Sequence, residues 1–207
     1  GLLITHTTRT QNASEFWKRA DIPIVAVDRI PADYDGPVCA LDNHQVGVMA
    51  TGHLYELGHR RIAHIAGPQT VRLALERQEG YLQTLTKRRE SYQRIICASD
   101  MWDTADGYRL MLELLDDPTP PTAVLASNDR IAIGALHAIC DRSLRVPEDI
   151  SLIGVDDIEI SEHLNPPLTT IRQPVEQLAQ HAVAMLLALI RGETLDEQVI
   201  LLQPELI

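Results

Sequence analysis

Short apolar runs alternate with helix-spaced segments through most of the chain. Each run ends in polar residues or glycine, and apolar residues at three- and four-residue spacing usually follow it. These runs lie at residues 61–68, 94–102 and 122–129, and a run at 149–157 closes the series. Strands that alternate with helices of this length form βαβ units with parallel pairing and right-handed crossovers. The pattern therefore predicts an α/β protein.

Further elements are expected on both sides of this series. Additional strands are expected at residues 1–7, 22–31, 38–43, 168–174 and 198–207. Helices are expected at residues 13–20, 46–59, 73–85, 104–115, 130–140 and 175–192. Thr104 is placed as an N-cap, and Gly58 as the left-handed residue that ends its helix, while the last helix is expected to stop at Gly192.

Polar residues follow several of the predicted strands at the point where each strand ends. In an open parallel sheet the carboxyl ends of the strands share one edge, and ligands bind in the crevice beside it. The residues expected along that crevice are Ser99, Asp100, Asn128, Asp129, Asp156 and Asp157.

Composition narrows the class of protein. The formal net charge of −11 disfavours nucleic-acid binding by this chain, because neutralising phosphates needs a basic face. Three widely spaced cysteines without a Cys-x-x-Cys pair predict reduced, buried thiols in a cytoplasmic protein. The apolar runs are too short to span a membrane, so we expect no membrane contact.

The motifs of the common enzyme and cofactor sites are not found. The strand ends carry neither the Gly-x-Gly-x-x-Gly of dinucleotide binding nor a P-loop, and Ser127 lacks the Gly-x-Ser-x-Gly elbow of hydrolases. His53, His59 and His64 do not have the spacing that places two zinc ligands on one helix face. Asp156 and Asp157 leave a strand toward opposite sides. We therefore expect no catalysis, no cofactor and no metal.

The remaining polar groups suit binding of a hydroxylated small molecule. Arginine offers a planar fork of donors, aspartate two acceptors and asparagine one group of each kind, a combination that fits vicinal hydroxyls of a sugar. Trp102 follows a predicted strand, where its indole could stack on the apolar face of a sugar ring. The alternative for Trp102 is half-buried packing.

Several motifs together resemble the lactose/galactose repressor family of bacterial transcription regulators. Their order and spacing agree from about Leu2 to the C-terminus. They are "YELGHRRIAHIAGP", the Arg-x-x-Gly-Tyr of "ALERQEGY", "PTAVLASNDRIAIGAL", "RVPEDISLIGVDD" and "PPLTTIRQP". The resemblance implies a type I periplasmic-binding-protein fold, with two doubly wound parallel-sheet subdomains joined by crossing strands.

The resemblance also implies roles for individual residues. Arg77 matches the effector-binding arginine of the family, and Trp102 matches the aromatic residue that stacks on the ligand. Asn128 and Asp156 match positions that bind ligand hydroxyls, while Asp129 is expected to cap the following helix. Many relatives carry Ser or Thr shortly before the arginine, where this chain has Val71 and Leu73.

At the level of the whole protein, the resemblance implies the effector-binding and dimerisation domain of a repressor. Residues 1–41 with 173–197 are expected to form the N-terminal subdomain, without its first two strand-helix units, and residues 42–172 with 198–207 the C-terminal one. A sugar, sugar acid or sugar phosphate would control operator binding by a homodimer, through a DNA-binding headpiece that these 207 residues do not include. The alternatives are a periplasmic sugar-binding protein of a transporter and an α/β enzyme.

Overall fold

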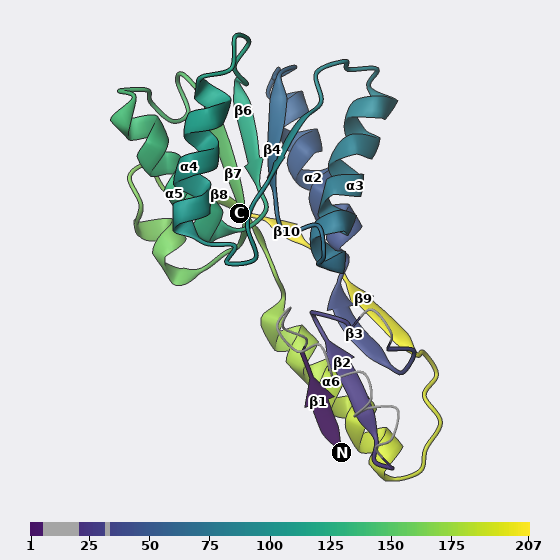
Figure 1. Cartoon of the computed structure of the whole chain (residues 1–207). Coiled ribbons are helices and arrows are strands. Elements are labelled where there is room, and N and C mark those ends of the chain that lie inside the picture. Colours follow the sequence, from purple (N-terminus) through teal and green to yellow (C-terminus); the bar gives the residue numbers. More distant parts are fainter. Residues whose placement is uncertain (6–20, 32–33) are drawn as a thin grey trace. The chain divides into compact units, whose positions relative to one another are not determined.

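The computed structural model describes residues 1–5, 21–31 and 34–207 (Figure 1). The chain forms two compact units, and the second contains the carboxyl-edge residues singled out above. Unit 1 comprises Gly1–Asp42 and Pro174–Pro204, and unit 2 comprises Asn43–Gln173 and Glu205–Ile207. Parallel sheets with helices packed on them confirm the predicted α/β class. The helix expected at residues 13–20 lies outside the described residues.

Unit 2 is built on a six-stranded sheet in the order β10-β8-β7-β6-β4-β5. All neighbouring strands pair in parallel except β10, which is antiparallel to β8. The strands are β4 (Ile62–Ala66), β5 (Arg94–Cys97), β6 (Ala123–Ala126), β7 (Ser151–Asp156), β8 (Thr169–Arg172) and β10 (Glu205–Leu206). The central strands are buried along their whole length, which explains their unbroken apolar sequences.

Helices cover both faces of this sheet (Figure 1). One face carries α2 (Asn43–Glu56) and α3 (Arg72–Lys87), and the other carries α4 (Thr104–Leu115) and α5 (Asp129–Asp141). A short 3-10 helix, η1 (Glu159–His163), lies between β7 and β8. The fold is therefore doubly wound, and the carboxyl ends of its parallel strands share one edge.

Glycine lets each pair of helices approach closely. A Cβ atom added to Gly47 of α2 would overlap the carbonyl oxygen of Arg77 on α3, and one added to Gly80 would overlap the carbonyl of His44. In the other layer, Gly107 and Gly134 make the same reciprocal contacts between α4 and α5. The helix backbones therefore touch at points where any side chain would separate them.

The helix ends follow the sequence signals with one correction. Gly58 has the predicted left-handed conformation, with a φ angle of 96°, and Gly192, which follows the last helix, has a φ angle of 75°. The N-cap of α4 is Asp103 rather than Thr104, because the Asp103 carboxylate accepts hydrogen bonds from the backbone N–H groups of Ala105 and Asp106. Thr104 is the first residue of the helix.

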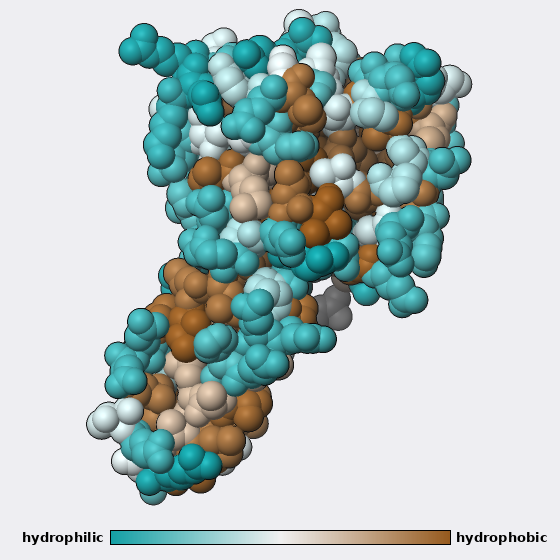
Figure 2. All heavy atoms as spheres, turned by 180° about the vertical axis from the view of Figure 1, so that it is seen from behind, coloured by the Kyte–Doolittle hydropathy of each residue, from teal (hydrophilic) through white to brown (hydrophobic). Residues whose placement is uncertain are grey.

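Unit 1 contains a parallel sheet in the order β1-β2-β3-β9, with α6 packed on it. Its elements are β1 (Leu2–Ile4), β2 (Ile24–Val27), β3 (Val38–Leu41), α6 (Val175–Ile190) and β9 (Val199–Leu202). Leu178, Ala182 and Met185 of α6 are buried against the sheet. Other apolar side chains of α6 are exposed, among them Leu187 and Ile190. Figure 2 shows apolar residues over much of the face of this unit that is in view.

The C-terminal tail differs from the expectation of one strand within the second subdomain. It contains two strands, which are separated by Gln203 and Pro204, and proline has no backbone N–H to donate to a sheet. β9 pairs with β3 in unit 1, and β10 pairs with β8 in unit 2, so residues 198–204 belong to the first unit.

The cysteines also differ in part from the expectation. All three are free, but only Cys39 is buried, whereas Cys97 and Cys140 are exposed.

Candidate functional site

Arg77 lies almost fully buried at the carboxyl edge of the unit 2 sheet, with only 2% of its surface exposed. Its Nε donates to Asn43 Oδ1 at 2.9 Å, and its Nη1 donates to the carbonyl oxygen of Ser127 at 2.5 Å. Its Nη2 lies 4.0 Å from Asp156 Oδ1. The guanidinium therefore joins the start of α2, the end of β6 and the end of β7.

Asp156 and Asp157 form a strained turn at the end of β7. Their φ angles are 118° and 56°, values that non-glycine residues seldom adopt. Asp156 Oδ1 accepts a hydrogen bond from Gln173 Nε2 at 2.5 Å, whereas Asp157 Oδ2 accepts one from Arg172 Nε at 2.6 Å. The two carboxylates therefore face different partners, as expected for adjacent residues leaving a strand.

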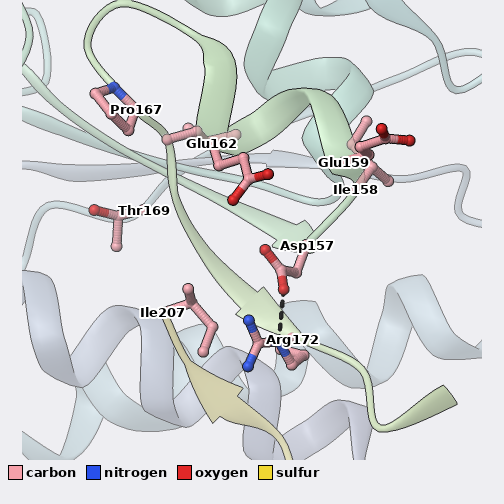
Figure 3. A pocket seen from close by; sticks show the side chains of 9 residues that line it. Asp157, Ile158, Glu159, Glu162, Pro167, Thr169, Arg172 and Ile207 are labelled. Carbon is pink, nitrogen blue, oxygen red and sulfur yellow. Dashed lines mark hydrogen bonds and ion pairs between the residues drawn. The ribbon is translucent and has the colours of Figure 1, made fainter. Parts of the chain in front are cut away.

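A hollow of about 400 Å³ lies on the Asp157 side of this turn (Figure 3). Figure 3 shows Asp157 paired with Arg172, and the carboxylates of Glu159 and Glu162 come from η1. None of the four effector-contact residues inferred from the sequence lines this hollow, so it is distinct from the group around Arg77.

Trp102 follows β5 and joins the same group of residues. Its indole Nε1 donates to Ser127 Oγ at 2.7 Å, and its φ angle of 50° is unusual for a bulky residue. The side chain is 7% exposed, and its ring packs so closely on Gly67 that a Cβ atom there would be only 2.7 Å from the ring. Trp102 is therefore part of the packed core of unit 2 at this edge, and is more buried than half-buried packing implies.

Asn128 takes the helix-capping role that was expected of Asp129. Asn128 is the N-cap of α5, because its Oδ1 accepts a hydrogen bond from Ile131 N at 2.8 Å. Its Nδ2 donates to the carbonyl oxygen of Trp102 at 3.3 Å. The assignment of the cap to Asp129 was wrong by one residue.

Asp129 instead holds the connection between β7 and β8. The residue is fully buried, and its carboxylate accepts hydrogen bonds from Ile158 N at 2.9 Å, Ser161 Oγ at 2.8 Å and Thr170 Oγ1 at 2.6 Å. Burial raises the pKa of this carboxyl above its usual range, while the three hydrogen bonds act in the opposite direction. Asp129 therefore fixes the segment that follows the Asp156–Asp157 turn.

The structure brings together all four residues inferred to contact the effector. Hydrogen bonds run from Arg77 through Ser127 to Trp102 and on to Asn128, and Asp156 lies beside the Arg77 guanidinium. Ser99, also expected at this edge, bonds instead to Asp106 of the following helix. Sequence reasoning missed Asn43, Ser127 and Gln173, although each stands at or just after the end of a predicted strand.

A buried histidine lies beneath Arg77. His64 of β4 is fully buried, and its Nδ1 lies 2.9 Å from the carbonyl oxygen of Leu125. Its ring contacts that of Tyr81, with centroids 5.4 Å apart. Burial, together with the nearby charge of Arg77, lowers the pKa of His64 to about 4, although the hydrogen bond to Leu125 acts in the opposite direction. His64 is therefore neutral near pH 7.

Two further observations concern other kinds of site. Within the described ranges, His, Cys, Asp and Glu side chains form no group of three able to hold a metal ion. No helix in the described part of the chain is both long and apolar enough to span a membrane.

Comparison with known proteins shows which family has this sequence and fold. Residues 51–207 match the profile of the periplasmic binding protein-like domain. The chain is 34% identical over 207 residues to the HTH-type transcriptional repressor CytR of Escherichia coli K12, covering 100% of this chain and 61% of that protein. It is 35% identical over 205 residues to the ribose operon repressor of the same strain, covering 99% and 62%. The chain thus spans less than two thirds of these curated relatives.

A solved structure agrees with these sequence matches. A regulatory protein of the LacI family from Chloroflexus aggregans superimposes with a TM-score of 0.90 and is 30% identical, with 99% of this chain and 74% of that chain covered. The chain therefore belongs to the periplasmic binding protein-like domain family and, within it, to the LacI family of regulators.

Proposed function

We propose that this chain is the effector-binding and dimerisation domain of a cytoplasmic LacI-type transcription repressor. The observation that carries the proposal is the single network at the carboxyl edge of the unit 2 sheet, which contains Arg77, Trp102, Asn128 and Asp156. The net charge of −11 supports contact with operator DNA through a separate headpiece of a longer protein.

The groups in this network suit a hydroxylated ligand. Arg77 supplies donors, Asp156 supplies acceptors, and Asn128 supplies a donor from Nδ2 while its Oδ1 caps the helix. The Trp102 ring provides an apolar surface at the same edge. Such a set binds hydroxyl groups from several directions without providing a nucleophile with a general base, which favours binding over catalysis.

The balance of charge favours a neutral sugar over a sugar acid or sugar phosphate. The positive charge of Arg77 stands beside the negative charge of Asp156, and Asp157 is paired with Arg172. An anionic ligand at Arg77 would also approach the Asp156 carboxylate, so attraction and repulsion would largely offset one another. A neutral polyol accepts hydrogen bonds from Arg77 and donates them to Asp156 without that conflict.

In this proposal the effector acts by favouring one arrangement of the domain over another. A ligand shifts such an equilibrium only by its difference in affinity for the two states. In the homodimer that shift would change the spacing of the headpieces and thereby operator affinity. The two alternatives, a transporter subunit and an α/β enzyme, are disfavoured because the matched relatives are transcription regulators.

Isothermal titration calorimetry tests the proposal with ribose, glucose and cellobiose, and with ribose 5-phosphate and gluconate as anionic counterparts. We expect a neutral sugar to bind and Arg77→Met to weaken its binding by roughly tenfold or more, the effect of losing a charged hydrogen bond. Arg72→Met is the matched control, since Arg72 lies exposed on the same helix and pairs with Glu76. Tighter binding of the anions would contradict the charge argument, and equal binding by both variants would contradict the site.

Fluorescence provides a second readout. Trp17 and Trp102 are the two tryptophans of the chain, so Trp17→Phe leaves Trp102 as the single reporter. We expect its emission to shift when the sugar found by calorimetry is added. Unchanged emission at saturating sugar would assign Trp102 to core packing alone.

A further inference from the structure

The chain passes between its two units at three places, and each passage has a polar residue on the unit 2 side. The passages are Asp42–Asn43, Gln173–Pro174 and Pro204–Glu205. The unit 2 residues joined to unit 1 by a peptide bond are therefore Asn43, Gln173 and Glu205. A change in the position of any of them acts on the backbone that joins the units.

Asn43 is tied directly to the effector-contact arginine inferred above. It is the first residue of α2 and only 2% exposed, and its Oδ1 accepts the hydrogen bond from Arg77 Nε at 2.9 Å. The short reach is possible because Gly47 and Gly80 allow α2 and α3 to touch. A buried hydrogen bond with a charged donor is short and strongly directional, so the positions of the two side chains depend on each other.

Gln173 is tied in the same way to Asp156. It is the last residue of unit 2 before Pro174, and its Nε2 donates to Asp156 Oδ1 at 2.5 Å. Asp129 fixes the backbone after the turn through Ile158. The Asp156 carboxylate contacts both Gln173 and Arg77, so it connects the second passage to the inferred effector-contact arginine.

The third passage is connected through a longer and more exposed route. Glu205 Oε2 lies 3.5 Å from Arg172 Nη1, and Arg172 Nε donates to Asp157 at 2.6 Å. Both Arg172 and Glu205 are largely exposed, so water screens this pair. The first two passages therefore carry the stronger connections.

We propose that Asn43 and Gln173 are positioning residues that couple effector contact to the passages between the units. This inference rests on the proposed function, because it takes Arg77 and Asp156 as effector contacts. A ligand hydroxyl that bonds either side chain changes its hydrogen bond to Asn43 or Gln173, so the effect reaches the joining backbone through one hydrogen bond. The ligand thereby stabilises one arrangement of the passages.

Hydrogen–deuterium exchange of the 207-residue protein without ligand tests the coupling separately from sugar binding. Arg77→Met removes the donor to Asn43, and we expect amide exchange in residues 40–46 and 171–175 to become about tenfold faster, the factor that corresponds to one hydrogen bond. The backbone N–H of Asp42, bonded to the carbonyl of Leu202, is a reporter at the first passage. Arg72→Met should leave both segments as in the wild type. Faster exchange confined to α3 would overturn the proposal.

A second pair of variants tests the same coupling in case the Arg77→Met protein does not fold. Gln173→Met keeps the length of the side chain and removes its donor to Asp156, and Gln83→Met changes an exposed glutamine that bonds Lys87. We expect faster exchange at residues 155–157 and 171–175 in Gln173→Met only. Identical exchange in the two variants would refute the coupling.

The sugar identified by calorimetry provides the final arm. Its addition should change exchange at both passages in the wild type, and this change should be lost or reduced at least severalfold in Gln173→Met although the sugar still binds. Sugar binding without any effect at the passages would overturn the coupling and leave the proposed function standing. Absence of sugar binding, with the exchange differences between variants intact, would reject the proposed function instead.

Discussion

The pH dependence of stability should be dominated, within unit 2, by the histidine buried in the central sheet. His64 lies in β4 beneath α3, and its Nδ1 faces the carbonyl oxygen of Leu125. Its Nε2 has no hydrogen-bond partner among the described residues. A proton on that nitrogen would place a charge in the core beside the Arg77 guanidinium, so the folded protein resists protonation.

The sign and size of the effect follow from the two pKa values of His64. The pKa falls from 6.5 to about 4 on folding. Above pH 6.5 the ring is neutral in both states and has no effect. Between pH 6.5 and 4 the unfolded chain takes up a proton that the folded chain does not, so stability falls as the pH falls. A difference of 2.5 units corresponds to about 3 kcal/mol of the free energy of unfolding, lost by pH 4.

Urea unfolding followed by circular dichroism at several pH values measures this loss. His64→Asn and His64→Met both remove the titrating ring, and subtracting their curves from the wild type cancels the carboxylates that all three proteins share. The two variants should differ from the wild type by different constant offsets but by the same pH-dependent amount, about 3 kcal/mol between pH 7 and pH 4. A wild-type-minus-variant difference that stays constant with pH would refute the reasoning.

Two other predictions concern packing and buried charge. Gly47→Ala should lower the free energy of unfolding by ~2 kcal/mol or more, because the added Cβ meets backbone atoms of Arg77. In the same helix, a Cβ added to Gly52 meets nothing within 4 Å, so Gly52→Ala should raise the free energy of unfolding by ~0.5–1 kcal/mol. Equal effects in urea unfolding would contradict the close contact of the helices. Asp129→Ala should cost about 3 kcal/mol, since two buried hydroxyl donors and one partly buried backbone N–H lose their acceptor. Asp149→Ala, which breaks a surface ion pair with Arg145, should have a much smaller effect. A small effect of Asp129→Ala in the same assay would show that water replaces the carboxylate.

The alternation of strands and helices could be predicted because it follows from local physics. Strands buried on both faces have unbroken apolar sequences, and the helices between them expose one polar side. Placing polar strand ends at a common edge needs only the parallel topology. Arg77 is different, because it lies on a helix. Only the resemblance to a known family pointed to it, and the contact between Gly47 and Gly80 that brings it to the edge is a tertiary feature.

The errors arose where distant partners decide between local options. Asn128 and Asp129 are both good N-cap residues, and the choice between them depends on Ser161 and Thr170, which lie more than thirty residues away and bind the Asp129 carboxylate. The tail offered ten residues of β-type sequence, and its division depended on pairing with β3 and β8. Pro204 was the one local signal of that break.

The reciprocal glycine contacts between helices have a mechanical consequence. In each layer of unit 2 the two helices touch backbone to backbone at both Gly47 and Gly80, or at both Gly107 and Gly134. Contacts of this kind leave no flexible side chains that could rearrange to let one helix slide along the other. We therefore expect each pair of helices to move as one rigid body, so that a displacement at one end of the pair also displaces its other end.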